Sequence, residues 1–260
     1  MDLGLKGKVA IVTGASKGIG AEIARELARE GCDVVIAARS PETLAERAKE
    51  IQALGRRAQA YPCDLREVDA PAALAKAALA TFGRIDIVVA NAGATKRGDF
   101  LALSDADWAD GFALKFFGHM RLIRAAWPAL VASQGAVVII SGAGGRTPGA
   151  EFAIGGSVNA ALLSLTKALA DRGVPDKVRV NVICPGSVRT DRMAVWVRER
   201  AKTLGVDEAE AIRGMVADAK SIGMGETIDI ASLAAFVASP RARYLHGAMI
   251  DMDGGQTKTL

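Results

Sequence analysis

The most informative chemistry in this sequence is a glycine-rich turn, TGASKGIG, at residues 13–20. An apolar run precedes the turn, and the helical pattern AEIARELARE follows it at once. Gly14, Gly18 and Gly20 would let backbone N–H groups and a helix N-terminus come close to a pyrophosphate. A glycine-rich turn alone is a weak signal, but here it stands between a strand and a helix, as a dinucleotide site requires. The turn therefore predicts a dinucleotide-binding site.

The end of the second apolar run distinguishes between two dinucleotides. An NAD-specific site usually places Asp or Glu there, to accept hydrogen bonds from the ribose hydroxyls. Here the run ends in Ala37, Ala38 and Arg39, none of which is acidic. Arg39 and Lys17 are instead able to hold a 2′-phosphate. The alternative is that both are ordinary surface cations. We expect NADP(H) rather than NAD(H).

Apolar, β-rich runs alternate with longer helical patterns along the chain. The runs are residues 9–12, 34–37, 85–90, 136–140, 178–183 and 248–250. This alternation predicts an α/β fold with a parallel sheet, and the continuously apolar runs predict helices on both faces of it. The least regular region, about residues 190–225, is rich in charge. We expect it to form a lid at the carboxyl edge of the sheet.

Composition limits the remaining possibilities. The 260 residues, half of them apolar, predict one domain, residues 1–260, with one large core. The start, MDLGLKGK, does not resemble a signal peptide, and no run of about 18 apolar residues occurs, so we expect a cytoplasmic protein with no membrane partner. Basic and acidic residues are interleaved despite a net charge of +4, so we expect no nucleic-acid partner. Three isolated cysteines and two histidines predict neither a disulfide framework nor a metal site.

Further motifs follow the glycine turn in a characteristic order. They are CDL at residues 63–65, ANAG at 90–93, NVICPGSVRT at 181–190 and DGG at 253–255. With these motifs the sequence resembles the short-chain dehydrogenase/reductase family along essentially the whole chain. The resemblance implies a Rossmann-type, doubly wound, seven-stranded parallel sheet.

The resemblance also implies which residues contact the cofactor. In the family, the residue matching Asp64 holds the adenine amino group, and the stretch from Pro185 to Thr190 meets the nicotinamide. The expected contacts are Gly14, Ser16, Lys17, Gly18, Ile19, Gly20, Arg39, Asp64, Leu65, Asn91, Ala92, Gly93, Pro185, Gly186, Val188 and Thr190.

The family's catalytic residues are the point at which this sequence departs from the pattern. Family members transfer a hydride between nicotinamide and a carbonyl or alcohol. They use a Tyr as acid/base, a Lys four residues later, a Ser that polarises the carbonyl and an Asn that anchors a water. Aligned on this chain, the Tyr, Lys, Ser and Asn positions hold Gly155, Asn159, Gly142 and Lys115. Neither tyrosine, Tyr61 or Tyr244, is followed by Lys four residues later, so the usual proton-transfer assembly is absent.

Lys115 and Asn159 stand where the family has Asn and Lys, an apparent exchange of residue types between neighbouring helices. The long stem of lysine would let an ammonium at position 115 reach the ribose and the reacting carbonyl from the other side. We hypothesise that Lys115 takes over ribose binding, electrostatic stabilisation or proton donation at a pKa lowered by burial. The alternative is that Lys115 extends to solvent or pairs with an acid, and that the exchange is coincidental.

Other residues near the expected site have both a functional and a structural interpretation. Ser141 carries a hydroxyl one residue before Gly142, but strand alternation aims it away from the family's serine position, which favours a strand-end cap. His119, one helical turn after Lys115, is a possible base or a packed core residue. Gly142 and Gly155 would clear space beside the nicotinamide for a bulky substrate.

Three charged residues, Arg97, Arg146 and Glu151, stand in the loops that follow the apolar runs 85–90 and 136–140, so we expect them near the cleft. They would either recognise an anionic substrate or be solvated, and the second interpretation is favoured.

Three functions fit these observations. The first is an NADPH-dependent oxidoreductase with a non-standard active site whose candidate catalytic residues are Lys115, Ser141 and Asn159. The second is a non-catalytic NADP(H)-binding regulatory or partner protein. The third is a redox-neutral lyase or isomerase on the same fold, which the retained phosphate cradle disfavours. The resemblance also implies a homotetramer or homodimer, packed through the helices around residues 104–132 and 151–172.

Overall fold

Seven parallel strands form one sheet in the computed structural model, which describes residues 2–259. The strands are β1 (Val9–Thr13), β2 (Asp33–Ala38), β3 (Ala58–Pro62), β4 (Ile87–Ala90), β5 (Ala136–Ile140), β6 (Arg179–Pro185) and β7 (Met249–Met252). Their order across the sheet is β3-β2-β1-β4-β5-β6-β7. The winding direction therefore reverses between β1 and β4, and ligands of such sheets bind beside this reversal, at the carboxyl ends of the strands.

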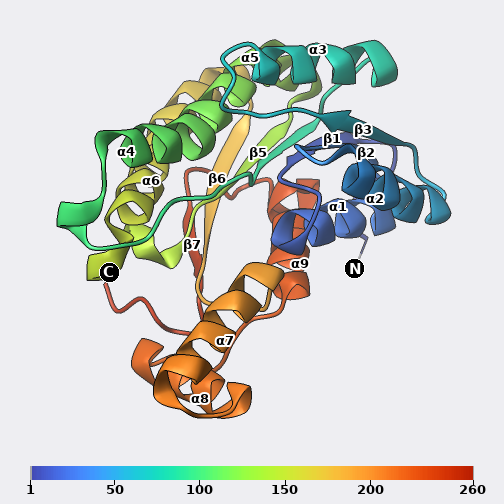
Figure 1. The fold of residues 1–260 in the computed structure, drawn as a ribbon. Helices are drawn as coiled ribbons and strands as arrows, with labels where there is room; N and C mark the ends of the chain where they lie inside the picture. Colours follow the sequence, from blue (N-terminus) through green and yellow to red (C-terminus); the bar gives the residue numbers. More distant parts are fainter. Residues whose placement is uncertain (1, 260) are drawn as a thin grey trace.

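Helices cover both faces of the sheet (Figure 1). One face carries α1 (Gly18–Arg29), α2 (Pro41–Ala53) and α9 (Thr227–Ala238). The other carries α3 (Ala70–Phe82), α5 (Gly118–Ser133) and α6 (Ala153–Asp176). The expected α/β, Rossmann-type, doubly wound seven-stranded parallel sheet in a single domain is confirmed.

Strand alternation separates the core into two apolar clusters. In β1, Ala10 and Val12 belong to the cluster that includes side chains of α1, α2 and α9, whereas Ile11 belongs to the cluster of α3, α5 and α6. All three residues are fully buried. Successive side chains of a strand point to opposite faces, so a strand between two helical layers must be apolar at every position.

Helix α4 (Asp105–Gly111) continues without a break into α5 through η2 (Phe112–Phe117), a π-helical segment. Lys115 lies in this segment. A π turn has one more residue than an α turn and is frequent at functional sites. The wide turn therefore marks the stretch that contains the exchanged lysine.

Strand β3 is the element that the apolar pattern does not show. Its sequence, AQAYP, has few β-branched residues, and its first four residues are only partly buried. Because β3 is the edge strand of the sheet, its residues do not need to be apolar on both faces. Six strands follow from the sequence pattern, and the seventh was expected only from the family resemblance.

Residues 190–225, the least regular part of the sequence pattern, are largely helical, and the lid expected there stays a prediction. They form two regular helices, α7 (Asp191–Leu204) and α8 (Glu208–Ala219). Met193, Val197, Ala201 and Ala211 make a small apolar cluster of their own between these helices. The charged residues of the segment lie mostly on the outside of a helix pair that projects from the body, drawn in orange in Figure 1.

One helical segment among the described residues, Ala150–Asp176, is long and apolar enough by length and composition to cross a membrane. It contains α6, whose Leu162, Leu163 and Ala170 are buried in the same apolar cluster as residues of β5 and β6. In this structure the apolar residues of α6 therefore serve the core beneath the sheet.

Asp86, just before β4, joins the amino ends of two central strands. Its carboxylate accepts hydrogen bonds from the Val9 backbone N–H at 2.9 Å, from Arg84 at 2.6 and 2.7 Å, and from Lys8 at 3.2 Å. Burial alone would raise the pKa of Asp86, but the hydrogen bonds from Arg84 and Val9 and the charge of Lys8 outweigh it, so the pKa is lowered from 3.8. A carboxylate with a lowered pKa stabilises the folded state above its unfolded pKa.

Replacing this carboxylate should therefore weaken the fold in a pH-dependent way. We expect Asp86→Asn to reduce the free energy of unfolding at pH 7 by about 1–3 kcal/mol, because the amide cannot accept all four hydrogen bonds. The difference from wild type should begin to shrink as the pH falls below about 4, where the carboxylate of the unfolded chain takes up a proton, and should continue to shrink until the pH passes the lowered native pKa. Urea unfolding at pH 7 and pH 3.5 measures both values. Asp171→Asn, at an exposed position of α6, is the control. An equal loss at both pH values would contradict the prediction.

Candidate active site

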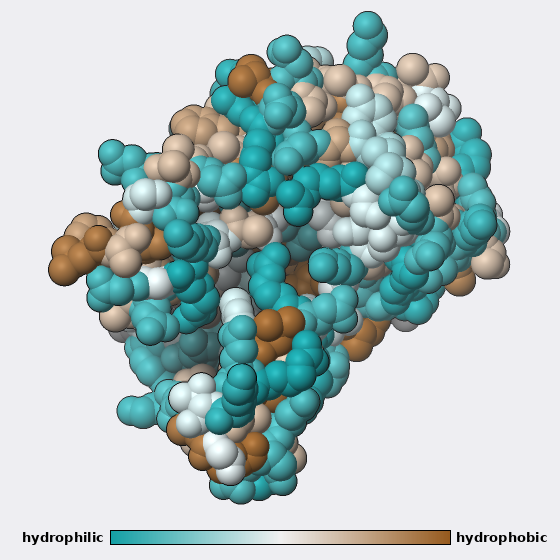
Figure 2. Space-filling model, in the orientation of Figure 1, coloured by the Kyte–Doolittle hydropathy of each residue, from teal (hydrophilic) through white to brown (hydrophobic). Residues whose placement is uncertain are grey.

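A cleft of about 840 Å³ lies at the carboxyl edge of the sheet, beside the reversal in strand order. Its walls come from the turn between β1 and α1, from the ends of β2, β4, β5 and β6, and from the start of α7. Figure 2 shows the surface hollowed between the body and the projecting α7–α8 segment. The fold thus brings together residues far apart in the sequence.

The glycine turn forms one wall of this cleft and leaves no room for side chains. Gly14 and Gly18 have φ angles of +65° and +58°, which non-glycine residues rarely adopt. A Cβ atom on Gly14 would lie 2.9 Å from both the Ala92 Cα and the Asn91 Nδ2. Helix α1 begins at Gly18, so its N-terminus points into the same space. This close-packed backbone fits the pyrophosphate of a dinucleotide.

Thr13 holds the end of β1 against the end of β4. Its hydroxyl accepts hydrogen bonds from the backbone N–H groups of Asn91 and Ala92 at 2.9 and 3.0 Å. Its carbonyl accepts from the Asn91 side chain at 2.8 Å. These bonds fix the glycine turn relative to β4 at the reversal in strand order.

Fifteen of the sixteen expected cofactor contacts line the cleft. They are Gly14, Ser16, Lys17, Gly18, Ile19, Gly20, Arg39, Asp64, Leu65, Asn91, Ala92, Gly93, Pro185, Gly186 and Thr190. Val188 is the exception, because its side chain is buried in the core and its backbone forms a parallel bridge with Gly225.

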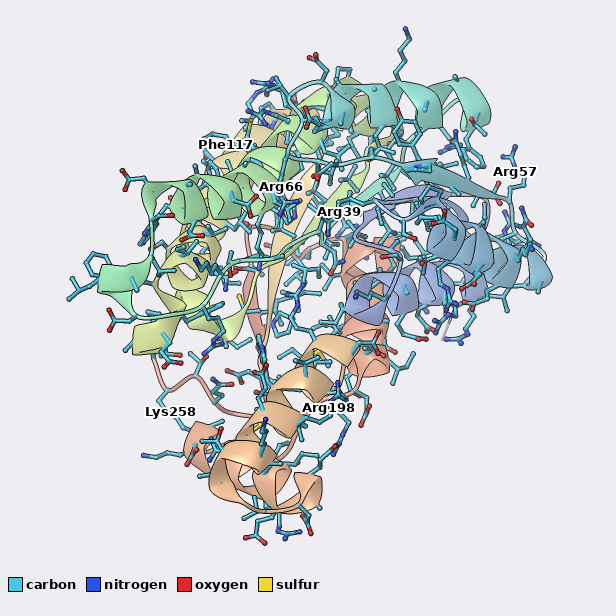
Figure 3. The ribbon with its side chains drawn as sticks, in the orientation of Figure 1. Arg39, Arg57, Arg66, Phe117, Arg198 and Lys258 are labelled. Atoms are coloured by element: carbon cyan, nitrogen blue, oxygen red, sulfur yellow. The ribbon has the colours of Figure 1, made fainter. Side chains whose placement is uncertain are left out.

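The charged residues at the end of β2 divide into paired and unpaired groups. Arg66 makes ion pairs with Asp64 at 3.3 Å and with Asp110 at 2.5 Å. Lys17 and Arg39, by contrast, are exposed and make no ion pair or side-chain hydrogen bond within residues 2–259. Figure 3 shows Arg39 and Arg66 close together at the carboxyl edge of the sheet. Both unpaired cations are therefore available to an anionic group of a ligand.

Lys115 and Asn159, the exchanged pair, are in direct contact. The Lys115 ammonium donates to the Asn159 Oδ1 at 2.6 Å and to the Ser141 carbonyl at 3.0 Å. Its stem passes over Gly93, where an added Cβ would lie 2.9 Å from the Lys115 Cδ. The π-helical segment, the end of β5 and helix α6 therefore meet at one ammonium group.

The surroundings of Lys115 lower its proton affinity. Burial lowers the pKa of Lys115 to about 8, and the charge of Arg192 acts in the same direction. No carboxylate forms an ion pair with Lys115 among the described residues, and the only opposing effect on its pKa is the smaller one of the Cys184 thiol. An ammonium group has three N–H donors, of which two are used by Ser141 and Asn159. The third has no acceptor among residues 2–259, and Lys115 lines the cleft.

Ser141 and His119 use their side chains within the protein. The Ser141 hydroxyl is buried and donates to the Asn159 carbonyl at 3.1 Å, as a cap between β5 and α6. His119 is fully buried, and its Nε2 donates to the Ala92 carbonyl at 2.7 Å. Burial and the charge of Lys115 lower the pKa of His119 to about 3, so this side chain is neutral.

The expectation that Gly155 clears space beside the nicotinamide was wrong, and for Gly142 the expectation stays a prediction. A Cβ on Gly155 would overlap the Phe152 ring, which also lies 2.8 Å from the Cβ position of Gly144. A Cβ on Gly142 would lie 3.0 Å from the Asn159 Nδ2. Phe152 thus occupies the space beside Gly155, whereas Gly142 itself lines the cleft.

Phe152, Trp196 and Arg192 line the cleft but were not predicted from the sequence. A signal for Phe152 was available, because it stands three residues before Gly155, one helical turn away, in a chain with only 5% aromatic residues. Trp196 and Arg192 belong to α7, whose helical pattern was not recognised.

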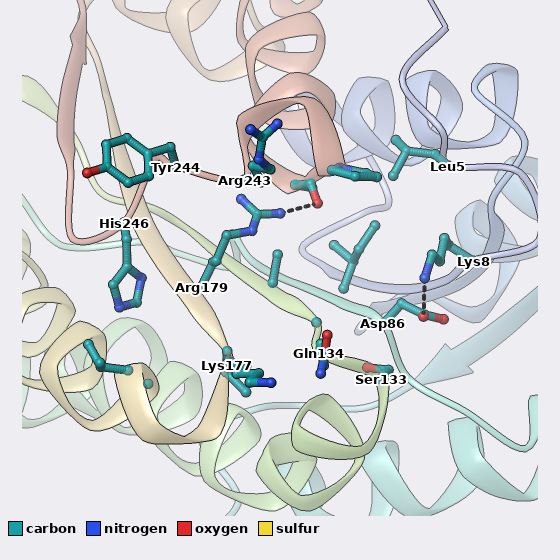
Figure 4. A pocket seen from close by; sticks show the side chains of 18 residues that line it. Leu5, Lys8, Asp86, Ser133, Gln134, Lys177, Arg179, Arg243, Tyr244 and His246 are labelled. Carbon is teal, nitrogen blue, oxygen red and sulfur yellow. Dashed lines mark hydrogen bonds and ion pairs between the residues drawn. The ribbon is translucent and has the colours of Figure 1, made fainter.

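A second hollow, of about 600 Å³, lies at the opposite, amino edge of the sheet (Figure 4). Its charged residues are largely engaged with the protein itself. Lys8 pairs with Asp86, and Arg179 donates to four backbone carbonyls near the end of α9. None of the expected site residues lines it, so the cleft at the carboxyl edge is the candidate active site.

Comparison with known proteins gives consistent similarities. Residues 8–201 match the family model described as short chain dehydrogenase. An uncharacterized oxidoreductase of Mycobacterium tuberculosis is 36% identical over 255 residues, which are 97% of this chain and 93% of that protein. The oxidoreductase UcpA of Escherichia coli is 36% identical over 261 residues, 97% of this chain and 95% of that protein.

The fold is also shared with solved structures. The L-sorbose reductase of Gluconobacter frateurii, solved in complex with NADPH and L-sorbose, superposes with a TM-score of 0.96 at 30% identity. That match covers 100% of both chains. The actinorhodin polyketide ketoreductase with NADPH has a TM-score of 0.91 at 29% identity, over 97% of this chain and 98% of that chain.

The packing of Phe152 on Gly155 predicts an unusual response to a helix-favouring substitution. Gly→Ala within a helix normally stabilises a protein by about 0.5–1 kcal/mol. We expect Gly155→Ala instead to lower the free energy of unfolding by about 1–3 kcal/mol, because the added methyl overlaps the ring. In a Phe152→Ala background the same substitution should be neutral or stabilising.

Denaturant unfolding of the four variants in this double-mutant cycle measures the coupling. Gly214→Ala, in the interior of α8, is the control, since its Cβ would meet only the flexible end of Arg200. Additive effects of Gly155→Ala and Phe152→Ala would show that the ring does not occupy this space.

Proposed function

We propose that this chain, which belongs to the short-chain dehydrogenase family, is an NADP(H)-dependent oxidoreductase that uses Lys115 as its proton donor. The reaction is hydride transfer between the nicotinamide and a carbonyl or alcohol group of a substrate. Oxidoreductases among its relatives and NADPH-bound reductases of the same fold support the reaction class. The geometry of Lys115 supports the identity of the donor.

The cofactor half of the cleft fits NADP(H). The glycine turn and the start of α1 would hold the pyrophosphate, and Lys17 and Arg39 would hold the 2′-phosphate, since neither has an acidic partner in the described chain. No acidic residue stands at the end of β2, where an NAD-specific site needs one. Bound NADP(H) would supply or accept the hydride.

The free third N–H of Lys115 is the observation that carries the proposal. Because Ser141 and Asn159 accept the other two hydrogens, the ammonium is held in one orientation. With a pKa of about 8 it is mostly protonated at pH 7, yet it is a stronger acid than an ordinary lysine. It would donate one proton to the carbonyl oxygen while the carbonyl carbon receives the hydride, which leaves a neutral amine that regains its proton from solvent.

Ser141 and Asn159 would act as positioning residues for Lys115. Asn159 contributes its side-chain oxygen, and Ser141 contributes its backbone carbonyl, while its hydroxyl caps α6. Neither side chain needs to touch the substrate for this role. A dimer or tetramer, a cytoplasmic location and a lid function for α7 and α8 stay predictions.

Arg39 tests the proposed cofactor preference. Loss of a charge-assisted hydrogen bond to the 2′-phosphate should raise the Kd for NADPH of Arg39→Ala about 10-fold and leave the Kd for NADH within about 2-fold. Calorimetric titration with each cofactor at one salt concentration measures both constants. Arg198→Ala, which removes an equal charge from the outer part of α7, is the control. Equal weakening for NADPH and NADH would argue against a 2′-phosphate contact.

Lys115 tests the proposed donor. We expect Lys115→Met to lower kcat for carbonyl reduction about 10²- to 10⁴-fold, the usual contribution of a general acid, while NADPH binding is retained. The assay follows NADPH consumption with a panel of carbonyl compounds that includes L-sorbose.

The pH profile is the second measurement for Lys115. The rate of carbonyl reduction by the wild type should fall as the pH rises through about 8, because the Lys115 ammonium loses the proton that it must donate. An Asn159→Leu variant, which lacks the acceptor for Lys115, should show a changed pH midpoint as well as a lower kcat. A Lys115→Met variant with wild-type turnover would refute the proposal, and NADPH binding without any turnover of the panel would favour a non-catalytic protein.

A further inference from the structure

We infer that the substrate carries a carboxylate, and that Arg97 binds it at the end of the cleft away from the cofactor. This inference rests on the proposed function, because it assigns the substrate class of the same site. It begins with an arginine that the sequence analysis favoured as a solvated surface residue. Arg97 follows β4 and lines the cleft together with Lys115.

Arg97 is held by two aromatic rings from different elements. Its guanidinium carbon lies 4.9 Å from the centre of the Phe152 ring and 5.0 Å from the centre of the Trp196 ring. Phe152 precedes α6 and Trp196 belongs to α7, so the guanidinium connects the body to the projecting segment. Stacking on aromatic faces uses the flat sides of a guanidinium and leaves the N–H donors at its edge.

The donors of Arg97 have no acceptor within the described residues 2–259. The Arg97 side chain makes no ion pair and no hydrogen bond with these residues, although Asp99 and Asp105 follow it closely in the sequence. Arg146, the other loop arginine considered from the sequence, faces Asp251 at 3.6 Å. Arg192 donates to the Gly93 carbonyl at 2.9 Å. Arg97, an exposed residue, therefore rests on the two rings while its hydrogen-bonding capacity is unused among the described residues.

The position of Arg97 suits recognition of a substrate that reacts at Lys115. The Phe152 ring beneath Arg97 packs against Gly155, the family's position for the catalytic tyrosine. Arg97 thus lies beside the place where the reacting group of a family substrate is expected. Lys115 and Arg192 line the same part of the cleft and add positive charge, and Asp191 is the acidic residue there. The substrate end of the cleft is positive overall.

A carboxylate matches this arrangement better than other anions. It is planar and accepts two parallel hydrogen bonds from the edge of a guanidinium, the part of Arg97 that the rings leave free. A phosphate can also accept two hydrogen bonds from a guanidinium edge. It carries a charge of about −1.5 to −2 and three acceptor oxygens, however, whereas of the three arginines Arg97 alone has all its donors unused among the described residues, since Arg192 and Arg146 are engaged within the protein. We therefore assign oxo acids, reduced to hydroxy acids, as the substrate class.

Matched pairs of oxo acids and their methyl esters, with increasing distance between carbonyl and carboxyl groups, test the assignment. For the wild type, kcat/KM should be at least about 10-fold higher for the acid of the best pair than for its ester. Arg97→Gln should lower kcat/KM for the acid about 10- to 100-fold, mainly through KM, and change that for the ester less than about 2-fold. Arg97→Lys, which keeps the charge but not the planar edge, should recover only part of the loss.

A control variant separates this role from general stacking. Arg121, in α5 and outside the cleft, stacks on the Phe117 ring at 5.2 Å. Arg121→Gln should leave kcat/KM unchanged for both the acid and the ester. Equal rates for acids and esters, unchanged by Arg97→Gln, would overturn the carboxylate assignment and leave the proposed oxidoreductase function standing. A preference for phosphorylated carbonyl compounds would overturn it in favour of phosphate.

Failure of the proposed function gives a different result. In that case no acid or ester is reduced. Calorimetry on the NADPH-saturated protein then tests whether Arg97 binds a carboxylate. Binding of the unreactive carboxylate, but not of its amide, and loss of this binding in Arg97→Gln would keep the anion site without the reaction. Equal binding of carboxylate and amide would overturn the anion site as well.

Discussion

A buried ammonium without a carboxylate partner constrains the architecture of this cleft. Removing a charge from water is costly unless hydrogen bonds replace the lost solvation. Lys115 meets this requirement with two neutral oxygens, the Ser141 carbonyl and the Asn159 side chain. One departure from the family pattern, Gly142, then has a physical reason, because a side chain there would crowd the Asn159 amide, which lies 3.0 Å from its Cβ position. Gly93, a glycine of the family's own ANAG motif, leaves room for the lysine stem, which passes 2.9 Å from its Cβ position.

The choice of neutral acceptors also determines how the site works. A carboxylate beside Lys115 would raise its pKa and hold its proton, whereas amide and carbonyl oxygens orient the ammonium with a much smaller effect on its acidity. Arg192, by its charge, lowers the pKa further. The same concentration of positive charge that weakens the hold of Lys115 on its proton attracts anions to the cleft. In the proposed function, the acidity of Lys115 and the attraction of an anionic substrate would thus be two effects of one electrostatic field.

Sequence reasoning predicted those parts of the structure that depend on local patterns. The glycine turn and the continuously apolar strands are encoded by residues close in sequence, whereas the doubly wound order of the strands was expected only from the family resemblance. The half-polar edge strand β3 and the helical nature of α7 and α8 were missed, because an edge strand and an exposed helix pair need little apolar periodicity. Lys115 and Asn159 could be named from the sequence, but their contact depends on a π-helical segment that no pattern indicated. The place of Phe152 against Gly155 is likewise a matter of packing between elements.

The separate packing of α7 and α8 has a consequence for how such a protein diversifies. The segment has its own small apolar cluster. The segment leaves the body and returns to it at one junction, where Val188 and Gly225 form a parallel β-bridge. At this junction the Arg189 N–H donates to the Gly225 carbonyl at 2.8 Å, and the Gly225 N–H donates to the Ser187 carbonyl at 2.9 Å. Residues between these points can be exchanged as a cassette without altering any strand of the sheet. Evolution, or a protein engineer, can therefore change the wall of the cleft that α7 provides, with Thr190 kept, while the glycine turn is inherited intact.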